Sequence, residues 1–132
     1  MTAVDTNIVV RFLTGDDPIQ FEQSIHIFST HEVFIPDTVI LEAEWVLRYA
    51  YEFDSEQVVE AFKKLFGLPN VHLRDTMPVA LALQWHENGL DFADALHLAL
   101  SQHCQDMQTF DQRFARRSER ITSCPVRLPA SN

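Results

Sequence analysis

The sequence predicts an α/β fold built on a short-stranded, mainly parallel sheet with helices on both faces. Short apolar runs of three or four residues alternate along the chain with longer segments of helical periodicity. Strands separated by helices favour right-handed crossovers, which join parallel strands and cover both faces of the sheet. With 132 residues, of which 46% are hydrophobic, we expect one compact domain spanning residues 1–132.

Each expected strand is an apolar run that a turn or helix-start signal ends. The first run stops at Asp5-Thr6-Asn7 and the second at Pro36-Asp37. The expected strands are, in order, Met1–Val4, Val33–Ile35, Val71–Leu73, Met107–Phe110 and, as an edge strand, Val126–Leu128.

The expected helices begin at aspartates that can cap them and carry apolar residues at spacings of three and four. Asp16-Asp17-Pro18 is typical of a helix start, because it combines a capping carboxylate with proline in the first turn. The expected helices run from about Ile8 to Leu13, Pro18 to Thr30, Val39 to Tyr51, Ser55 to Phe66, Met77 to Glu87 and Phe92 to His103, with a short one beginning at Asp111.

Composition limits where the protein works and what it binds. Two cysteines make no disulfide framework, and the sequence has neither a signal peptide pattern nor an apolar stretch of about 20 residues, so we expect a cytoplasmic protein without a membrane segment. The net charge of −9 argues against a broad basic surface for nucleic acid. Two explanations remain: a basic partner, or acids that bind divalent cations and reverse the local charge.

Most of the acids have simple structural explanations. Glu44 stands four residues before Arg48, the favourable order for a surface ion pair on a helix. Five aspartates precede expected helices and are interpreted as caps: Asp16, Asp17, Asp37, Asp54 and Asp75.

Four acids remain as candidates for a site. Asp5 and Asp111 follow expected strands, where ligands bind in parallel sheets, although each could equally cap the next helix. Glu42 and Asp94 have apolar helical neighbours, where an ionised acid is costly unless it is paired or bound to metal. Aspartate is also unfavourable inside a helix. These four carboxylates are therefore the candidate ligands.

Four segments, in order, resemble the motifs of PIN-domain ribonucleases, and specifically the VapC-type toxins of bacterial toxin–antitoxin pairs. They are Val4–Leu13, an apolar strand leading into Asp-Thr-Asn; Val39–Arg48, with its first glutamate; Leu90–His97; and Thr109–Phe114. The resemblance is strongest over residues 1–114. It implies a PIN-like three-layer α/β/α fold.

The resemblance also implies a chemistry. It assigns metal binding and catalysis to Asp5, Glu42, Asp94 and Asp111, with support from Thr6, Asn7 and Thr109. Asp91 is either an auxiliary acid or the N-cap of the helix that holds Asp94. Mg²⁺ and Mn²⁺ prefer carboxylate oxygens, and such ions would activate water to hydrolyse an RNA phosphodiester. The implied partners are RNA, a VapB-type antitoxin and a second copy of the chain in a homodimer.

Several alternatives remain open at the level of sequence. The chain could be a non-catalytic PIN-like binding module, whereas a haloacid-dehalogenase-like phosphatase is disfavoured because Asp5-Thr6-Asn7 lacks a second acid. We interpret His97 as a hydrogen-bonded core residue, and Cys104 and Cys124 as unreactive packing thiols. The basic cluster Arg113, Arg116, Arg117 and Arg120 is either a solvated helix face or a contact with the RNA backbone.

Overall fold

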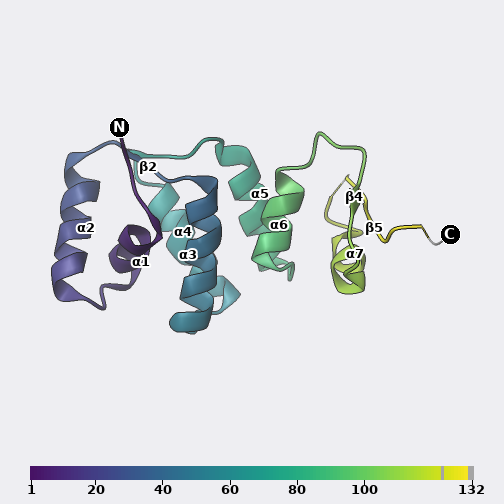
Figure 1. The fold of residues 1–132 in the computed structure, drawn as a ribbon, viewed down its shortest axis with the longest axis horizontal. Coiled ribbons are helices and arrows are strands. Elements are labelled where there is room, and N and C mark those ends of the chain that lie inside the picture. Colours follow the sequence, from purple (N-terminus) through teal and green to yellow (C-terminus); the bar gives the residue numbers. More distant parts are fainter. Residues whose placement is uncertain (123, 131–132) are drawn as a thin grey trace. The chain divides into compact units, whose positions relative to one another are not determined.

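The computed structural model describes residues 1–122 and 124–130, in which short strands alternate with helices (Figure 1). The chain forms two compact units, Met1–Arg74 and Asp75–Asn132, each with its own parallel strands. The α/β class and the parallel pairing expected from the sequence are therefore confirmed. The expectation of a single domain stays a prediction.

The first unit is built around a three-stranded parallel sheet in the order β1-β2-β3. Val33 and Phe34 of the central strand pair with Thr2 and Ala3 on one side and with Val71 and His72 on the other. Its strands are β1 (Thr2–Ala3), β2 (Val33–Phe34) and β3 (Val71–His72), and its helices are α1 (Thr6–Thr14), α2 (Pro18–Thr30), α3 (Asp37–Ala50) and α4 (Ser55–Phe66). Two helices therefore separate each strand from the next.

Side chains and glycine fix the ends of these helices largely as the sequence predicts. The carboxylate of Asp17 accepts the Gln20 backbone N–H at 3.0 Å, and Asp54 forms a capping box with Gln57. Gly15 ends α1 in the left-handed conformation with φ of 65°, and its N–H donates to the Arg11 carbonyl at 2.9 Å.

Two of the five predicted caps are wrong, because other side chains bind these carboxylates. Asp16 accepts from Arg11 Nη1 at 3.0 Å and from the Tyr51 hydroxyl at 2.5 Å. Asp37 is the first residue of α3, which Pro36 precedes without a side-chain cap, and it pairs with Arg74 Nη2 at 2.9 Å. Asp37 and Arg74 follow neighbouring strands, so the parallel register brings them together.

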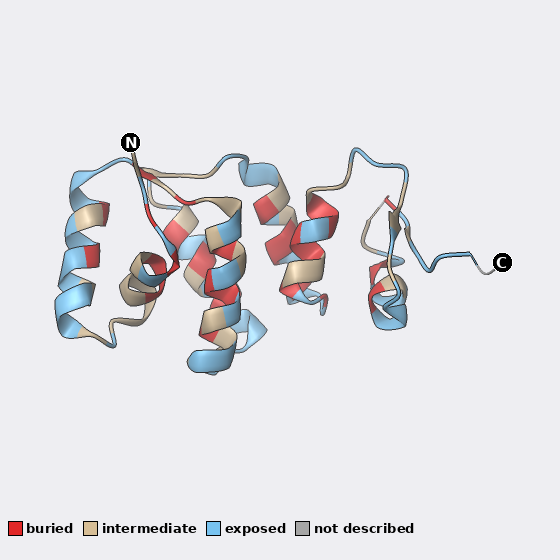
Figure 2. Ribbon diagram, viewed as in Figure 1, coloured by how far each residue is buried: buried red, intermediate tan, exposed pale blue. Residues whose placement is uncertain are grey.

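The core of the first unit lies on the inward faces of its helices and on the sheet, which appear as red segments in Figure 2. In Figure 1, α1 lies between α2 and α3, and Phe12 of α1 stacks on Phe28 of α2 with ring centroids 4.1 Å apart. The largest fully buried side chains here include Ile35, Ile40, Leu47, Phe62 and Leu65. Burial of one such side chain stabilises the fold by about 1.5–3 kcal/mol.

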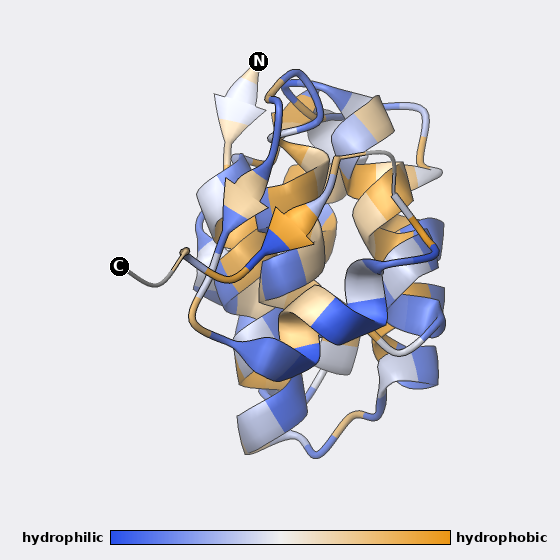
Figure 3. Ribbon diagram, turned by 90° about the vertical axis from the view of Figure 1, so that its right-hand side faces the viewer, coloured by the Kyte–Doolittle hydropathy of each residue, from blue (hydrophilic) through white to orange (hydrophobic). Residues whose placement is uncertain are grey.

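The second unit pairs two helices and adds a small parallel sheet. Its elements are α5 (Thr76–Glu87), α6 (Phe92–Ala99), β4 (Met107–Gln108), α7 (Gln112–Ser118) and β5 (Val126–Arg127), with Met107 and Gln108 paired to Val126 and Arg127. Helices α5 and α6 pack against each other, as does α7 against β5. Figure 3 shows hydrophilic and hydrophobic segments within single helices, as expected where one side of a helix is buried.

Helix α6 ends four residues earlier than expected, at Ala99 rather than His103. Polar side chains bond back to its last carbonyls, from Ser101 Oγ to His97 at 2.8 Å and from Gln102 Nε2 to Leu98 at 3.0 Å. Such side-chain bonds compete with continuation of the helix. None of the described helices is long and apolar enough to cross a membrane.

Candidate active site

Asp5 lies directly after the first strand and begins α1. The backbone N–H of Val4 continues the pairing with β2 by donating to the Phe34 carbonyl at 3.1 Å, which fixes the chain just before Asp5. Asp5 is the N-cap of α1, and its Oδ1 accepts from the Ile8 N–H at 3.2 Å. The side chain is exposed, and its other oxygen makes no hydrogen bond or ion pair with the described residues. One carboxylate can therefore cap the helix and still offer an oxygen to a ligand.

Glu42 is tied to the segment that carries Asp5. Helices α1 and α3 pack together, and the buried Thr6 hydroxyl donates to Glu42 Oε1. Because Thr6 follows Asp5 immediately, this bond links the carboxylate of Glu42 to the backbone segment that carries Asp5. The second oxygen of Glu42 has no partner among the described residues.

The expected roles of the two glutamates on α3 differ from the observed ones. Glu42 is exposed rather than set on the apolar face, and Glu44, expected at the surface, is buried with 1% of its area exposed. The buried stripe of α3 contains Ile40, Ala43 and Leu47, and Glu44 shares that face. Arg48 satisfies it through two bonds, Nε to Oε2 at 2.8 Å and Nη2 to Oε1 at 3.1 Å. The predicted pairing of Glu44 with Arg48 is confirmed, but the prediction that Glu44 lies at the surface is wrong.

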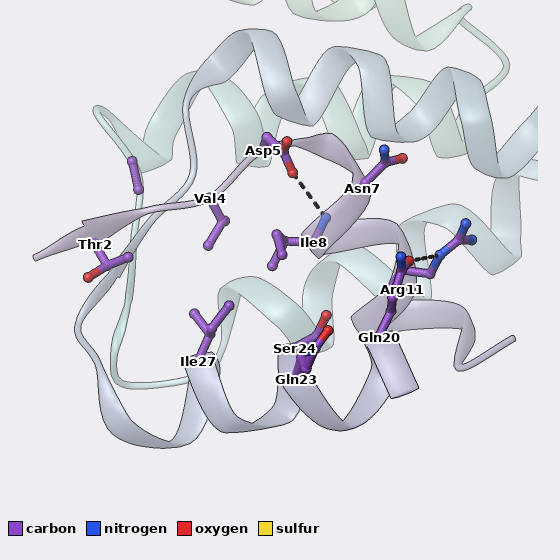
Figure 4. Close-up of a pocket in the computed structure, with 11 residues that line it drawn as sticks. Thr2, Val4, Asp5, Asn7, Ile8, Arg11, Gln20, Gln23, Ser24 and Ile27 are labelled. Atoms are coloured by element: carbon purple, nitrogen blue, oxygen red, sulfur yellow. Dashed lines mark hydrogen bonds between the residues drawn. The ribbon is translucent and has the colours of Figure 1, made fainter. Parts of the chain in front are cut away.

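A pocket of about 530 Å³ opens beside Asp5 between β1, α1 and α2 (Figure 4). Its size is within the range of small-ligand sites. The buried Ser24 Oγ on its wall has no hydrogen-bond partner among the described residues. The polar residues that line it are Thr2, Asp5, Asn7, Arg11, Gln20, Gln23 and Ser24. Asn7 therefore lines the same space as Asp5, although no hydrogen bond links the two.

Asp94 belongs to the second unit and lies in the first turn of α6. Asp91 is the N-cap of this helix, and its Oδ2 accepts from the Asp94 N–H at 3.3 Å. The prediction that Asp94 lies within this helix is confirmed, but it is the third residue, near the positive end of the helix dipole, which favours an acid, so aspartate is not unfavourable here. Asp91 does serve as a cap, which was one of its two expected roles.

Asp111 begins α7 and is the most firmly anchored of the four acids. Its Oδ1 accepts from the N–H groups of Arg113 at 2.9 Å and Phe114 at 3.1 Å. Its own N–H donates to Thr109 Oγ1 at 3.0 Å, so Thr109 positions the backbone that carries the carboxylate. Asp111 is exposed, and its other oxygen has no partner in the described part of the chain.

The three acids of the second unit interact electrostatically. Partial burial raises the pKa of Asp94, and the negative charges of Asp91 and Asp111 raise it further, while His97 acts in the opposite direction. A raised pKa of this origin means that the ionised form lacks a compensating cation. A bound cation would supply one.

Other side chains correct the sequence interpretation. His97 is exposed near Asp94 rather than in the core, and a spacing of three residues on one helix could have indicated this neighbourhood. The buried histidine is His86, whose Nδ1 lies 2.7 Å from the Leu90 carbonyl oxygen. Cys124 is buried as expected, whereas Cys104 is exposed and is no packing thiol.

The donors fit a hard divalent cation by their chemistry. Asp5 and Glu42 in the first unit, and Asp94 and Asp111 in the second, offer carboxylate oxygens that no described residue occupies, and such oxygens suit Mg²⁺ or Mn²⁺. Within the described ranges, however, no three acids, histidines or cysteines are grouped closely enough to hold an ion. Each unit therefore presents a pair of candidate ligands.

Comparison with known families agrees with this chemistry. The PIN domain family model matches residues 2–120, a range that includes all four acids. No curated protein sequence is significantly similar to the chain. The match confirms the expected PIN-like α/β/α fold with short parallel strands, and it supports a nuclease. The chain therefore belongs to the PIN domain family, whose members are generally metal-dependent nucleases.

Proposed function

We propose that this protein is a Mg²⁺- or Mn²⁺-dependent endoribonuclease that acts as the VapC-type toxin of a type II toxin–antitoxin pair. The observation that supports the proposal is that the family match and the chemistry of the four acids agree. All four acids expected from the motifs lie inside the matched range 2–120, and each has an oxygen without a described partner. We further propose that residues 1–132 work as one domain, in which Asp5, Glu42, Asp94 and Asp111 share the metal.

Each residue has a defined part in this proposal. The four carboxylates would hold the metal ions, which would supply a Lewis acid to activate water and to stabilise the leaving oxyanion. Thr6 holds Glu42 in place, and the Ile8 N–H holds Asp5, which leaves one oxygen of each without a described partner. Thr109 and the first turn of α7 hold Asp111, while Asn7 lines the pocket beside Asp5. None of these side chains needs to act as a nucleophile.

The proposed partners follow from charge and exposed apolar area. A net charge of −9 and carboxylate oxygens without a described partner suit a basic VapB-type antitoxin whose arginine or lysine pairs with the acids. The exposed Trp45 and Tyr49, which pack on each other on α3 with ring centroids 4.9 Å apart, support a homodimer surface. We expect the protein to act in the cytoplasm.

A non-catalytic PIN-like binding module is the second candidate. One observation favours it: Asp5 and Asp111 both cap helices, so their presence has a structural reason without any metal. The two functions make different predictions for a substitution that keeps the cap and removes the charge.

The test compares Asp5→Asn with Asp17→Asn in cleavage of total bacterial RNA by purified, antitoxin-free protein. Both aspartates cap a helix by accepting an N–H three residues on, at 3.2 Å for Asp5 and 3.0 Å for Asp17, and asparagine caps about as well. We expect metal-dependent cleavage by the wild type and Asp17→Asn, and none by Asp5→Asn at equal thermal stability. Absence of metal-dependent cleavage by the folded wild type would support the binding module instead.

A further inference from the structure

An acidic protein that cleaves RNA must still contact a polyanion, and its cations are unevenly distributed. The chain has ten lysines and arginines against nineteen acids. Four of the ten lie within eight residues, in α7 and the turn that follows it: Arg113, Arg116, Arg117 and Arg120. We call these residues the α7 arginines.

Three of the α7 arginines are available for a ligand. Arg117 has a structural role, because its Nη1 donates to the Gly89 carbonyl at 3.0 Å. Arg113, Arg116 and Arg120 are exposed, and none of them forms an ion pair within the described residues. Arg113 and Arg116 are three residues apart and so lie on one face of α7, and Arg120 follows in the turn after it.

The helix itself does not explain why all three are arginines. Arg116 is in the last turn of α7, where a cation is stabilised by the negative end of the helix dipole. Arg113 is the second residue of the helix, at the positive end, where the dipole disfavours a cation. The helix dipole therefore does not account for a guanidinium at this position.

Phe110 adds an aromatic surface beside this cluster. It is 90% exposed, and it directly precedes Asp111 and α7. The backbone around it is fixed, because the Thr109 N–H donates to the Arg127 carbonyl at 2.9 Å and the Asp111 N–H donates to Thr109 Oγ1 at 3.0 Å. Single exposed apolar residues are common on proteins. An exposed ring that precedes three available arginines in the chain supplies the two kinds of side chain that single-stranded nucleic acid binding uses.

We propose that Phe110, Arg113, Arg116 and Arg120 form a binding surface for an unpaired RNA strand. A base stacks on the Phe110 ring, and the guanidinium groups contact the phosphates that follow it. The surface begins next to Asp111, so a strand held there runs past one of the candidate metal ligands. This inference rests on the proposed ribonuclease function for the identity of the ligand. An acidic protein segment would use the arginines but has no base to stack on Phe110.

The test measures binding of a fluorescently labelled 12-nucleotide oligouridylate by anisotropy, in EDTA to prevent metal-dependent cleavage, across a range of salt concentrations. The first variant combines Arg113→Gln, Arg116→Gln and Arg120→Gln. Its matched control combines Lys63→Gln, Lys64→Gln and Arg74→Gln, which removes the same charge from the first unit. Phe110→Ala and Phe110→Tyr test the ring. Thermal melting of every variant verifies that it is folded.

Each substitution has its own expected signature. The arginine variant should weaken binding and reduce the slope of log affinity against log salt by about 0.7 for each lost phosphate contact, hence by about 2 in total. Phe110→Ala should weaken binding about tenfold with an unchanged slope, and Phe110→Tyr should restore it. The matched control variant should keep the wild-type slope. An RNA duplex of the same length should bind more weakly than the single strand.

The proposal is overturned if the two triple variants bind alike, or if polyglutamate competes as well as the RNA. Cleavage assays separate this result from the nuclease itself. Binding through α7 without any metal-dependent cleavage would refute the nuclease and leave the RNA surface standing. Cleavage by a wild type whose arginine and phenylalanine variants bind RNA normally would refute the surface alone.

Discussion

Two glutamates lie two residues apart on α3, and their substitution should produce opposite phenotypes. Glu42 is exposed and held by Thr6, whereas Glu44 has 1% of its side chain exposed and is paired with Arg48. We predict that Glu42→Gln abolishes metal-dependent RNA cleavage and leaves stability nearly unchanged. Glu44→Gln should lower stability and leave cleavage by the folded protein close to the wild-type level.

The magnitudes follow from the contacts. Glu44→Gln removes the negative charge, so two bonds between opposite charges, at 2.8 and 3.1 Å, become at most one bond from the Arg48 guanidinium to a neutral amide oxygen. A buried charged hydrogen bond contributes about 1.5–3 kcal/mol, but the Arg48 side chain is 33% exposed and can rehydrate, so we expect a loss of about 2 kcal/mol. In a domain of this size that lowers Tm by roughly 6–10 °C. Glu42→Gln keeps an oxygen to accept from Thr6 and should change stability by less than about 0.5 kcal/mol.

The assay pairs thermal melting in EDTA with cleavage of one RNA substrate at a temperature where both variants are folded. A Glu44→Gln protein that melts like the wild type would refute the inferred burial of this ion pair. A Glu42→Gln protein that cleaves normally would remove Glu42 from the proposed metal site. Loss of cleavage in both variants with no change in Tm would contradict the division of roles between the two glutamates.

Three further predictions concern the same sites. Burial and the charges of Asp91 and Asp111 raise the pKa of Asp94. The folded protein therefore holds the proton of the Asp94 carboxyl more tightly than the unfolded chain does. The contribution of Asp94 to stability declines as the pH rises above its ordinary pKa of 3.8. In metal-free melts, Asp94→Asn should therefore gain a few degrees over the wild type above about pH 4, and equal Tm values at pH 7 would contradict this. Thr6→Val removes the hydroxyl that orients Glu42 and should reduce activity or metal affinity by about 10–100-fold, as measured by cleavage rates against Mg²⁺ concentration. The control is Thr14→Val, which removes a half-buried hydroxyl bonded to the Val10 carbonyl and to Asp16. Burial raises the pKa of the Cys124 thiol, whereas Cys104 is exposed, so iodoacetamide should modify only Cys104 in the folded protein; mass spectrometry showing equal labelling of both would contradict the structure.

The sequence by itself determined the elements and the candidate residues, because those depend on local chemistry. Apolar runs ended by turn residues predicted all five strands, and aspartates before apolar periodic segments predicted most helix starts. The motif order identified the family that the match over residues 2–120 confirms. Local rules also placed Asp5, Asp91 and Asp111 at helix starts, as the structure shows.

Only the tertiary structure decided which acids are buried and what pairs with them. Helical spacing assigned Glu42 to an apolar face and Glu44 to the surface, yet the face that packs inward is the one that contains Glu44. Asp37 was expected to cap a helix but pairs with Arg74, which is 37 positions away in sequence. Asp16 was also expected to cap a helix but binds Arg11 and Tyr51. A periodic pattern states which residues share a face, but the direction of that face depends on packing partners distant in the chain. The same is true of Phe110, which was expected in a strand and is instead almost fully exposed beside Asp111, because β4 ends at Gln108.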